Sequence, residues 1–520
     1  MSRIKYNLIL IILTILALIA PDFLSQLVSD KNHAVLSGKF IIGLSLFSIA
    51  LSFTPRLFIL TILTLFIFIE VIQFCNLFYY GTLITSSKFR LLFSEIDEVW
   101  LVAKEAVSFL YLVPLLILIP YGTLAFIVYK LEKTRIKSIW AIIPVLLLLA
   151  IIPFRVSKAY HGENYYPDPS DHSLRNSLYA VTNCLYNLIY PAAIPVTNYK
   201  EYQIESINNW DLDKNSNIIL IIGESANYSH MSLFGYERDT NPLLSTLKTS
   251  PNFTYLKGLS SGVSTPVSLA YLINNIYEPN NMQEIENKTA NLFRLAKQHD
   301  FKTFYISAQS GAFLTNMGVE YIDYKLFRNN RLFLFKEHQD EALLKIIPNL
   351  DYTEKNFIVI HQRNAHAPYE ENYEHNSKFN HFDANKDNYQ QFRIDTYDNA
   401  TLYNDFLIYK MIQFYKEKFN GPTYIFFTSD HGEVLDSNKV AFGHAELKKE
   451  VAEVPFLAYI KNAANEKIKN IKEPIFHYEI SNLIIELMGF KIINPNQKPN
   501  IFYIHGTELD GHNEFIEYHK

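Results

Sequence analysis

The chain has 520 residues, which exceeds one ordinary domain, so two folded units are expected. Its formal net charge of −5 mixes both signs and gives no overall basic field that would attract phosphates, which excludes nucleic-acid binding as a function class. The two cysteines, Cys75 and Cys184, lie far apart in the sequence and predict buried thiols rather than a disulfide framework.

Long uncharged apolar runs dominate the chain before Phe154. Five of them are long enough to cross the hydrocarbon core of a bilayer, which takes about 20 residues of helix. They cover residues 4–24, 36–53, 57–78, 107–129 and 138–154. No small-residue cleavage site follows the first run, and four more runs come after it, so we interpret it as an uncleaved anchor rather than a signal peptide.

Lysine and arginine residues set the orientation of these predicted spans. They flank alternate ends, at Arg3 and Lys5, at Arg56, and in the segment 130–137. The positive-inside rule assigns such loops to the cytoplasm. An odd number of spans then places everything after Phe154 outside the cytoplasm.

Two further features of the membrane half are candidates for function. Glu70 lies towards the outer end of the third predicted span, where an ionised group is costly, so it is either functional or paired within the helix bundle. The segment 80–106 is too polar to cross. The spacing of Phe89, Leu92 and Phe93 predicts an amphipathic helix at the membrane interface there.

Short β-rich runs separated by helical stretches begin near Ile218 and predict an α/β fold, with a mostly parallel sheet flanked by helices. The expected strands are Ile218–Ile222, Thr303–Ser307, Phe357–His361, Tyr424–Thr428 and Pro455–Ile460. The expected helices lie near 286–299, 389–418 and 477–489. The predicted domains are therefore a five-helix transmembrane domain (1–154), an interfacial bridge (155–216) and a sheet domain (217–520).

Polar side chains gather just beyond the ends of three predicted strands. Glu224 follows the first strand, the segment 361–366 the third, and Asp430 and His431 the fourth. In open α/β sheets, ligands bind at the carboxyl ends of the strands. Two carboxylates and one imidazole make a plausible zinc site with room for a fourth ligand. An isolated Asp-His pair would predict only a polar turn, but three such residues together predict a metal centre.

A hydroxyl is the expected fourth ligand, because a serine or threonine is a weak nucleophile at neutral pH unless a base or a metal lowers its pKa. The candidates are Ser225 and the Ser/Thr-rich segment 260–268, which contains Ser264 and Thr265. The pattern alone does not choose among them. Such a segment is also typical of a loop or a helix cap.

Four motifs together resemble the phosphoethanolamine transferases of Gram-negative envelopes, and the resemblance covers nearly the whole chain. The motifs are Gly223-Glu224-Ser225, Ser232-Leu233-Phe234-Gly235-Tyr236-Glu237-Arg238-Asp239-Thr240-Asn241-Pro242, Tyr397-Asp398-Asn399-Ala400 and Ser429-Asp430-His431-Gly432-Glu433. The resemblance implies a multi-pass protein of the cell inner membrane. Its five-helix membrane domain would be followed by a periplasmic catalytic domain of the alkaline-phosphatase and sulfatase fold.

The resemblance also implies the roles of single residues. Glu224, Asp430 and His431 correspond to zinc ligands. Thr265 corresponds to the nucleophile and a further zinc ligand, because it occupies the position of the second threonine in the family's Gly-Thr-Ala-Thr segment. The chain departs from that pattern on both sides of Thr265, and Ser264 is the alternative nucleophile.

His366 and His444 resemble two histidines that contact the phosphoethanolamine group in this family, whereas His361 and His477 are interpreted as structural. A phosphodiester transfer needs charge stabilisation on the phosphoryl oxygens and a proton donor for the leaving alkoxide, and a histidine can provide both. The implied donor is the membrane lipid phosphatidylethanolamine, and a zinc-activated Thr265 would carry its phosphoethanolamine. The implied acceptor is lipopolysaccharide, at a core sugar such as heptose or at lipid A, or another envelope glycan.

Three alternatives are weaker. A phosphoglycerol transferase of the lipoteichoic-acid-synthase type shares the spans, the fold and a metal-activated threonine, but the motif 232–242 disfavours it. A sulfatase activity is disfavoured because no Cys/Ser-x-Pro-x-Arg sequence lies near the metal segment. A catalytically silent scaffold is disfavoured because all four candidate ligand positions are metal-competent. Members of the resembled family that act on lipid A are typically disulfide-rich in the soluble domain and have Leu-His-Gly where this chain has Phe442-Gly443-His444. With at most one cysteine after the membrane half, this chain therefore resembles members with a core sugar or another periplasmic glycan as acceptor more than those acting on lipid A.

Overall fold

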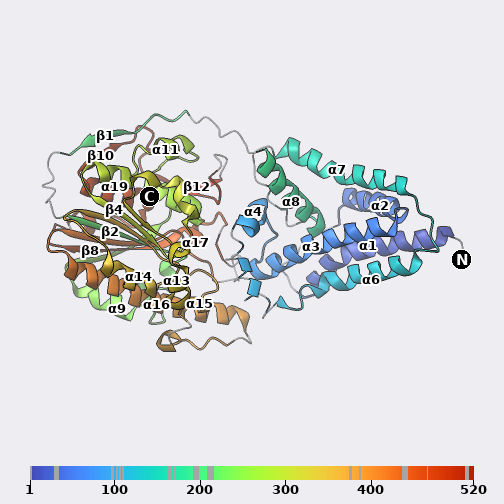
Figure 1. Ribbon diagram of the computed structural model, residues 1–520, viewed down its shortest axis with the longest axis horizontal. Helices are drawn as coiled ribbons and strands as arrows, with labels where there is room; N and C mark the ends of the chain where they lie inside the picture. Colours follow the sequence, from blue (N-terminus) through green and yellow to red (C-terminus); the bar gives the residue numbers. More distant parts are fainter. Residues whose placement is uncertain are drawn as a thin grey trace. The chain divides into compact units, whose positions relative to one another are not determined.

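The computed structural model describes residues 3–520 apart from 29–33, 35, 95, 97–98, 101–102, 105–106, 108–109, 161–164, 166, 169, 191–197, 208–215, 374–376, 386–387, 436–442, 445, 465 and 510–513. The chain divides into two compact units, Met1–Ala193 and Ile194–Lys520 (Figure 1). Phe442 and parts of the segments 80–106 and 107–129, on which predictions were made, lie outside the described residues.

The first unit is a bundle of apolar helices (Figure 1). Its helices are α1 (Arg3–Val28), α2 (Gly38–Ser52), α3 (Arg56–Tyr80), α4 (Ser86–Ser94), α6 (Leu115–Leu131), α7 (Ile142–Ala159) and α8 (Ser173–Ile189). Within the described chain, α1, α3 and the run Ile139–Ala159 are long and apolar enough to cross a membrane, and α2 and α6 are shorter apolar helices. The predicted membrane helices are therefore present as a class, while their count of five spans stays a prediction.

Buried polar groups join α8 to the apolar helices of this unit. Ser173 Oγ lies 2.8 Å from Asp22 Oδ2 and 3.0 Å from Glu70 Oε2, and Ser177 Oγ lies 3.2 Å from Glu70 Oε1. His172, the N-cap of α8, places Nε2 2.8 Å from Asp22 Oδ2. Glu70 is thus paired within the bundle, as buried carboxylates in membrane helices generally are.

The second unit is built on an eight-stranded, mostly parallel sheet with the order β5-β4-β6-β2-β7-β8-β3-β9. Its strands are β2 (Asn217–Gly223), β3 (Phe253–Leu259), β4 (Lys302–Ser307), β5 (Tyr324–Leu326), β6 (Asn356–His361), β7 (Thr423–Ser429), β8 (Glu453–Lys461) and β9 (Ile475–Phe476). Only β8 runs against its neighbours β7 and β3. Two antiparallel pairs complete the unit: β1 (Gln203–Ser206) with β10 (Phe490–Ile493), and β11 (Ile501–His505) with β12 (Phe515–His519).

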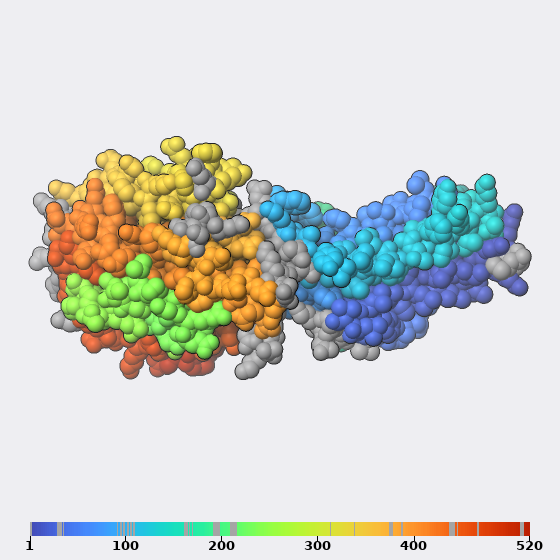
Figure 2. Space-filling model, turned by 90° about the horizontal axis from the view of Figure 1, so that it is seen from below, coloured from blue at the N-terminus to red at the C-terminus, as the bar shows by residue number. Residues whose placement is uncertain are grey.

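Helices cover both faces of this sheet (Figure 1). They are α9 (Pro242–Ser245), α10 (Thr265–Asn274), α11 (Met282–Asn287), α12 (Leu292–Gln298), α13 (Leu332–His338), α14 (Glu341–Ile346), α15 (Glu370–Tyr373), α16 (Tyr389–Lys418), α17 (Lys449–Ala452), α18 (Glu466–Lys469) and α19 (His477–Leu487). The short α9 adjoins the long α16 on the face that Figure 2 shows. The predicted α/β class is therefore confirmed.

The side chains of the central strand β2 are buried on both faces of the sheet, where the helices cover them. All seven of its residues are buried, as expected for a parallel strand with helices on both sides. Ile219 and Ile221 belong to the core shared with α14 and α16, whereas Ile218, Leu220 and Ile222 belong to the core shared with α10, α12 and α19. Alternate side chains of one strand thus hold two separate hydrophobic cores, and this fixes the position of its carboxyl end.

The prediction of a single helix near 286–299 is wrong. The structure has α11 and α12 there, because Lys288 adopts a left-handed conformation with φ of 53° and ends α11. Asn291 then starts α12 by accepting a hydrogen bond from the backbone N–H of Arg294.

Candidate active site

Two neighbouring strands bring the candidate metal ligands together. β2 and β7 are parallel, and their register pairs Gly223 with Ser429. The next residue along each strand is Glu224 and Asp430, so the two carboxylates emerge side by side at the carboxyl edge of the sheet. Both are fully buried.

Glu224, Asp430 and His431 form a compact cluster, with one ligand atom from each lying within 4.8 Å of the others. His431 Nε2 is 3.4 Å from Glu224 Oε1 and 3.4 Å from Asp430 Oδ2. Thr265 Oγ1 completes the group, at 2.6 Å from Asp430 Oδ2, 3.3 Å from Glu224 Oε2 and 3.3 Å from His431 Nε2. The four residues predicted as ligands therefore meet at one point.

Hydrogen bonds from neighbouring groups orient each carboxylate. Asp430 Oδ1 accepts hydrogen bonds from the backbone N–H groups of His431 at 2.7 Å and Ser225 at 3.1 Å. Glu224 Oε1 accepts the Ser225 hydroxyl at 2.8 Å. Ser225 has a φ of 55°, a conformation that non-glycine residues rarely adopt and that is common at functional sites. Its constrained backbone orients both ligands.

The hydrogen-bond pattern of His431 fits a metal ion. His431 Nδ1 lies 2.9 Å from the carbonyl oxygen of Gly432, which can only accept, so Nδ1 carries the hydrogen. In the neutral ring, Nε2 then presents a lone pair to two carboxylates. The three residues could hold a metal ion, and oxygen and nitrogen ligands of this kind suit zinc.

Thr265 sits at the start of α10, and its N-cap is Ser264. The two hydroxyls point to different partners, because Ser264 Oγ donates to the carbonyl oxygen of Thr507 at 3.2 Å rather than to the carboxylate cluster. The positive end of the α10 dipole lies at Thr265, where it favours negative charge on an attached phosphoryl group. The geometry favours Thr265 over Ser264, and the assignment of the nucleophile stays a prediction.

Hydrogen bonds to a segment near residue 505 hold the loop before Thr265 in place. Val263 N–H donates to the carbonyl oxygen of His505 at 3.1 Å, and His505 N–H donates to that of Ser261 at 2.9 Å. The His505 ring also lies against Tyr271 of α10 and places Nδ1 2.6 Å from the Ser261 carbonyl oxygen. Strand β11 thereby fixes the position of the loop that precedes Thr265.

Several residues that support the site were not predicted as parts of it. The Gln309 side chain donates to Glu224 Oε2 and, at 3.1 Å, to the Gln362 carbonyl oxygen. Gln309 follows β4 by two residues, so the strand-end rule that found Glu224 was also the signal for Gln309. His477 has no such signal, although it accepts the Ser261 N–H at Nδ1 and lies 3.0 Å from the Ser429 carbonyl oxygen at Nε2.

His366 and His444 lie together beside the metal cluster. The His444 ring centroid is 4.4 Å from that of His431 and 6.0 Å from that of His366. His444 Nδ1 lies 2.9 Å from Glu433 Oε2. Burial lowers the pKa of His444, but the carboxylate of Glu433, with those of Glu224 and Asp430, outweighs burial and raises the pKa to about 9.

The motif around Arg238 has a structural role. Arg238 Nη1 lies 2.7 Å from Asp395 Oδ1 and 2.9 Å from Asp398 Oδ2, which ties the loop after β2 to α16. Between these two acids, Tyr397 turns inward and donates its hydroxyl hydrogen to the Ser225 carbonyl oxygen at 2.7 Å. The motif therefore reaches the metal cluster through Tyr397 and Ser225.

The second unit is thus a mostly parallel α/β domain whose strand ends gather a carboxylate–imidazole cluster, which could hold a metal ion, beside a threonine. The sulfatase family model matches residues 216–490, which is more than half of the chain, and the chain belongs to the sulfatase family.

Particular relatives narrow this class. The chain is 29% identical to phosphoethanolamine transferase EptC of Escherichia coli (strain K12) over 46% of this chain and 42% of that protein. It is 25% identical to Kdo(2)-lipid A phosphoethanolamine 7''-transferase of the same organism over 52% of this chain and 51% of that protein. The chain thus spans about half the length of these curated relatives. They confirm the resemblance to phosphoethanolamine transferases.

One solved structure matches both units of the fold. It is the integral membrane protein lipooligosaccharide phosphoethanolamine transferase A (EptA) from Neisseria meningitidis, with a TM-score of 0.59 and 17% sequence identity. The match covers 94% of this chain and 96% of that one. At this identity the likeness establishes the fold: an apolar helical domain followed by an α/β domain.

Proposed function

We propose that this protein is an inner-membrane enzyme that transfers phosphoethanolamine from phosphatidylethanolamine to a lipopolysaccharide acceptor, with its α/β domain in the periplasm. The observation that carries the proposal is the position of Thr265 Oγ1, which lies 2.6 Å from Asp430 Oδ2 and within 3.3 Å of the other two candidate ligands. The names of the relatives support the transferred group, and the apolar helices support a donor that is itself a membrane lipid.

Glu224, Asp430, His431 and Thr265 are the residues that would hold zinc. Bound zinc supplies Lewis-acid chemistry, which lowers the pKa of a nearby hydroxyl and offsets the charge of two buried carboxylates. Ser225 and Gln309 would orient the Glu224 carboxylate, and Ser225 and the His431 backbone would orient Asp430. Such supporting hydrogen bonds are usual around metal ligands.

In the first half-reaction, Thr265 Oγ1 passes its proton to Asp430 Oδ2, 2.6 Å away, and attacks the phosphorus of phosphatidylethanolamine. A bond forms between Oγ1 and phosphorus, and the bond between phosphorus and the glycerol oxygen breaks. The leaving oxygen of diacylglycerol takes a proton from His366 or His444, the two histidines beside the cluster. The first turn of α10 stabilises negative charge on the phosphoryl oxygens.

In the second half-reaction, the acceptor attacks the phosphothreonine. The same histidine now removes the proton from the acceptor hydroxyl or phosphate, and the acceptor oxygen bonds to phosphorus. The bond between phosphorus and Thr265 Oγ1 breaks, and Oγ1 takes its proton back from Asp430 Oδ2. The acceptor is a core sugar such as heptose or lipid A. Comparing the lipopolysaccharide of wild-type and deletion strains by mass spectrometry distinguishes the two.

Covalent labelling tests the proposal directly. After incubation with phosphatidylethanolamine, the purified protein is expected to gain one phosphoethanolamine, which maps to the peptide 257–274. Thr265→Ala should take up none and transfer none, while Ser264→Ala, the matched control one residue away, should keep both properties. An adduct on Ser264 or Ser225 would overturn the nucleophile, and a phosphoglycerol adduct from phosphatidylglycerol would establish the alternative donor.

A further inference from the structure

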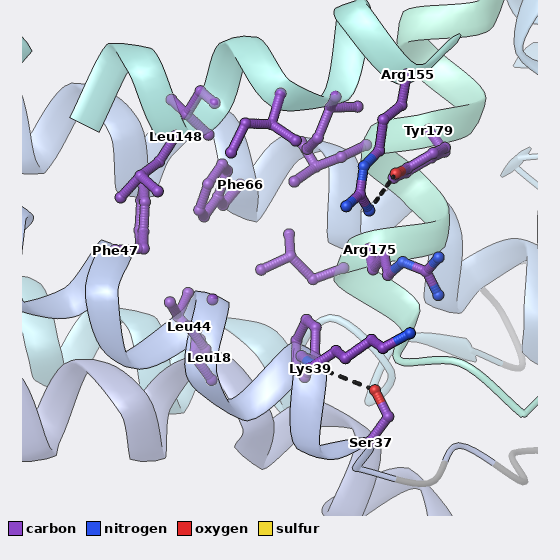
Figure 3. A pocket seen from close by; sticks show the side chains of 17 residues that line it. Leu18, Ser37, Lys39, Leu44, Phe47, Phe66, Leu148, Arg155, Arg175 and Tyr179 are labelled. Carbon is purple, nitrogen blue, oxygen red and sulfur yellow. Dashed lines mark hydrogen bonds between the residues drawn. The ribbon is translucent and has the colours of Figure 1, made fainter. Parts of the chain in front are cut away.

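An apolar groove of about 340 Å³ lies within the first unit, between α2, α3, α7 and α8. Its walls are lined by side chains such as Leu44, Phe47, Phe66 and Leu148 (Figure 3). The volume is in the range of about 300–1,000 Å³ that is usual for sites of small molecules. The groove can therefore hold a molecule with an apolar body.

One end of this groove is cationic. Lys39, Arg155 and Arg175 line it there, together with Tyr179, while Phe47 and Leu148 lie at the other end (Figure 3). Arg155 Nη1 donates to the Tyr179 hydroxyl at 3.4 Å. Arg175 pairs with Asp171. Lys39 has no ion pair with any residue that the structure describes.

The predicted membrane topology makes the position of these cations unusual. Lys39 begins α2 and Arg155 lies near the end of α7, so both lie at the ends that the predicted orientation puts outside the cytoplasm. Lysine and arginine are expected to concentrate on the cytoplasmic side instead. Three cations gathered at an outer end, next to an apolar groove, are explained by an anion that carries an apolar tail.

We propose that this groove binds an anionic glycerophospholipid of the outer leaflet, with an acyl chain along the apolar walls and the phosphodiester against Lys39, Arg155 and Arg175. A zwitterionic lipid fits less well, because its ammonium group would meet Lys39 and Arg155, and the nearby carboxylate of Asp171 already pairs with Arg175. Basic pockets between membrane helices are typical sites for acidic head groups. The proposal concerns lipid binding and does not rest on the transferase activity.

Native mass spectrometry of the full-length protein in detergent tests the proposal, with phosphatidylglycerol and phosphatidylethanolamine as separate probes. The wild type is expected to retain phosphatidylglycerol more strongly. Arg155→Gln and Lys39→Gln should each weaken its binding about five-fold, the usual effect of one cation near an acidic head group. Lys133→Gln, the matched control at an exposed lysine that does not line the groove, should bind as the wild type does.

A second pair of variants tests the apolar part while leaving the cations intact. Gly43 lines the groove, and a Cβ added there meets no atom within 4 Å, so Gly43→Leu should fill the groove without breaking the helix and should abolish retention. Gly122 of α6 has equally open space and does not line the groove, so Gly122→Leu should retain lipid. Thr265→Ala should also bind normally, which separates this site from the proposed chemistry.

Three results would overturn the proposal: equal retention of both lipids, undiminished binding by Gly43→Leu, or no retained lipid in any form of the protein. Preferential retention of phosphatidylethanolamine would instead identify the groove as a donor site.

Discussion

At the scale of single residues, the site depends on which atom of each ligand is left free. Ser225 occupies Asp430 Oδ1 and a carbonyl oxygen occupies His431 Nδ1, so Asp430 Oδ2 and His431 Nε2 face Thr265. Glu224 Oε2 also faces Thr265, although it accepts a hydrogen bond from Gln309. The strand-end pattern predicted the ligands. It could not predict this choice of atoms, because the choice depends on backbone conformation at Ser225 and on neighbours distant in sequence.

Gln309 should matter for metal affinity although it is not a ligand. Gln309→Leu removes the hydrogen bond that orients Glu224, and loss of such a supporting bond typically costs about 10- to 100-fold in metal affinity. Competition for zinc against a chelator measures the change. Gln298→Leu, at an exposed position on α12, is the control and should keep wild-type affinity. Unchanged affinity in Gln309→Leu would mean that Glu224 needs no such support.

Buried histidines should make the α/β unit sensitive to acid. Burial lowers the pKa of His505 to about 4, against about 6.5 when unfolded. Between these pH values the unfolded chain binds a proton that the folded chain does not, so the free energy of unfolding rises with pH. The stabilising contribution of neutral His505 is complete above pH 6.5 and disappears as the pH falls from 6.5 to 4. The full contribution is about 3 kcal/mol. His361 and His477 behave in the same way, with pKa values lowered to about 4 and about 3.

Replacing His505 with asparagine tests this linkage. His505→Asn keeps a donor for the Ser261 carbonyl oxygen but cannot titrate, so its melting temperature should fall less between pH 6.5 and 4.5 than that of the wild type. His519→Asn, at a ring that is 71% exposed, should leave the wild-type pH dependence unchanged. Parallel pH profiles for His505→Asn and the wild type would contradict the account.

At the scale of elements, the sequence predicted helices and strands correctly where one physical signal dominates. Helix 389–418 was predicted with the bounds that α16 has, and the central strands β2, β6 and β7 extend the predicted ones by one or two residues. These strands are buried on both faces, so their apolar runs are continuous. β3 was missed because its middle is half exposed and mixes polar with apolar side chains. Its pairing is set by β8, far along the chain.

The attachment of α8 through Glu70 gives a testable case. Glu70→Leu would remove one acceptor from the hydroxyls of Ser173 and Ser177, which keep Asp22 and the Ser173 carbonyl oxygen as partners, and each lost hydrogen bond costs about 0.5–1.5 kcal/mol. Cys184 lies buried on α8, so its reaction with a maleimide should become faster. Glu70→Gln keeps an accepting oxygen and should leave Cys184 protected. Equal labelling in both variants would show that the charge, not the hydrogen bonds, holds α8.

At the scale of the whole molecule, the two units follow different rules of folding. In the first unit the apolar helices expose many large side chains, as suits a lipid environment, while the second buries its apolar residues around a sheet. The change in composition after Phe154 predicted an apolar first part and a more polar second part, whereas the two units divide between Ala193 and Ile194. The sequence could not predict that α8, inside the predicted bridge 155–216, would join the first unit, because that depends on its polar contacts with Asp22 and Glu70.

Topology is the prediction that concerns the whole chain. The asymmetry of lysine and arginine puts the carboxyl end of the chain outside the cytoplasm. Alkaline phosphatase fused after Lys520 should therefore be active in cells, because it folds only outside the cytoplasm, and green fluorescent protein fused there should be dark. Activity of the cytoplasmic reporter alone would mean that the number of spans is even.

The hydrogen bonds that hold the loop of the proposed nucleophile have a consequence for biosynthesis. Ser264 and Thr507 are joined by a hydrogen bond across 243 positions of sequence, and Val263 and Ser261 are bonded to His505. During export, the loop that carries Thr265 emerges long before the segment that fixes it. A partly translocated chain would therefore lack an ordered nucleophile while it is already in contact with membrane lipid. Reactivity would begin only when translation and export have delivered residues 505–507, so delivery of this segment would itself act as the activating event.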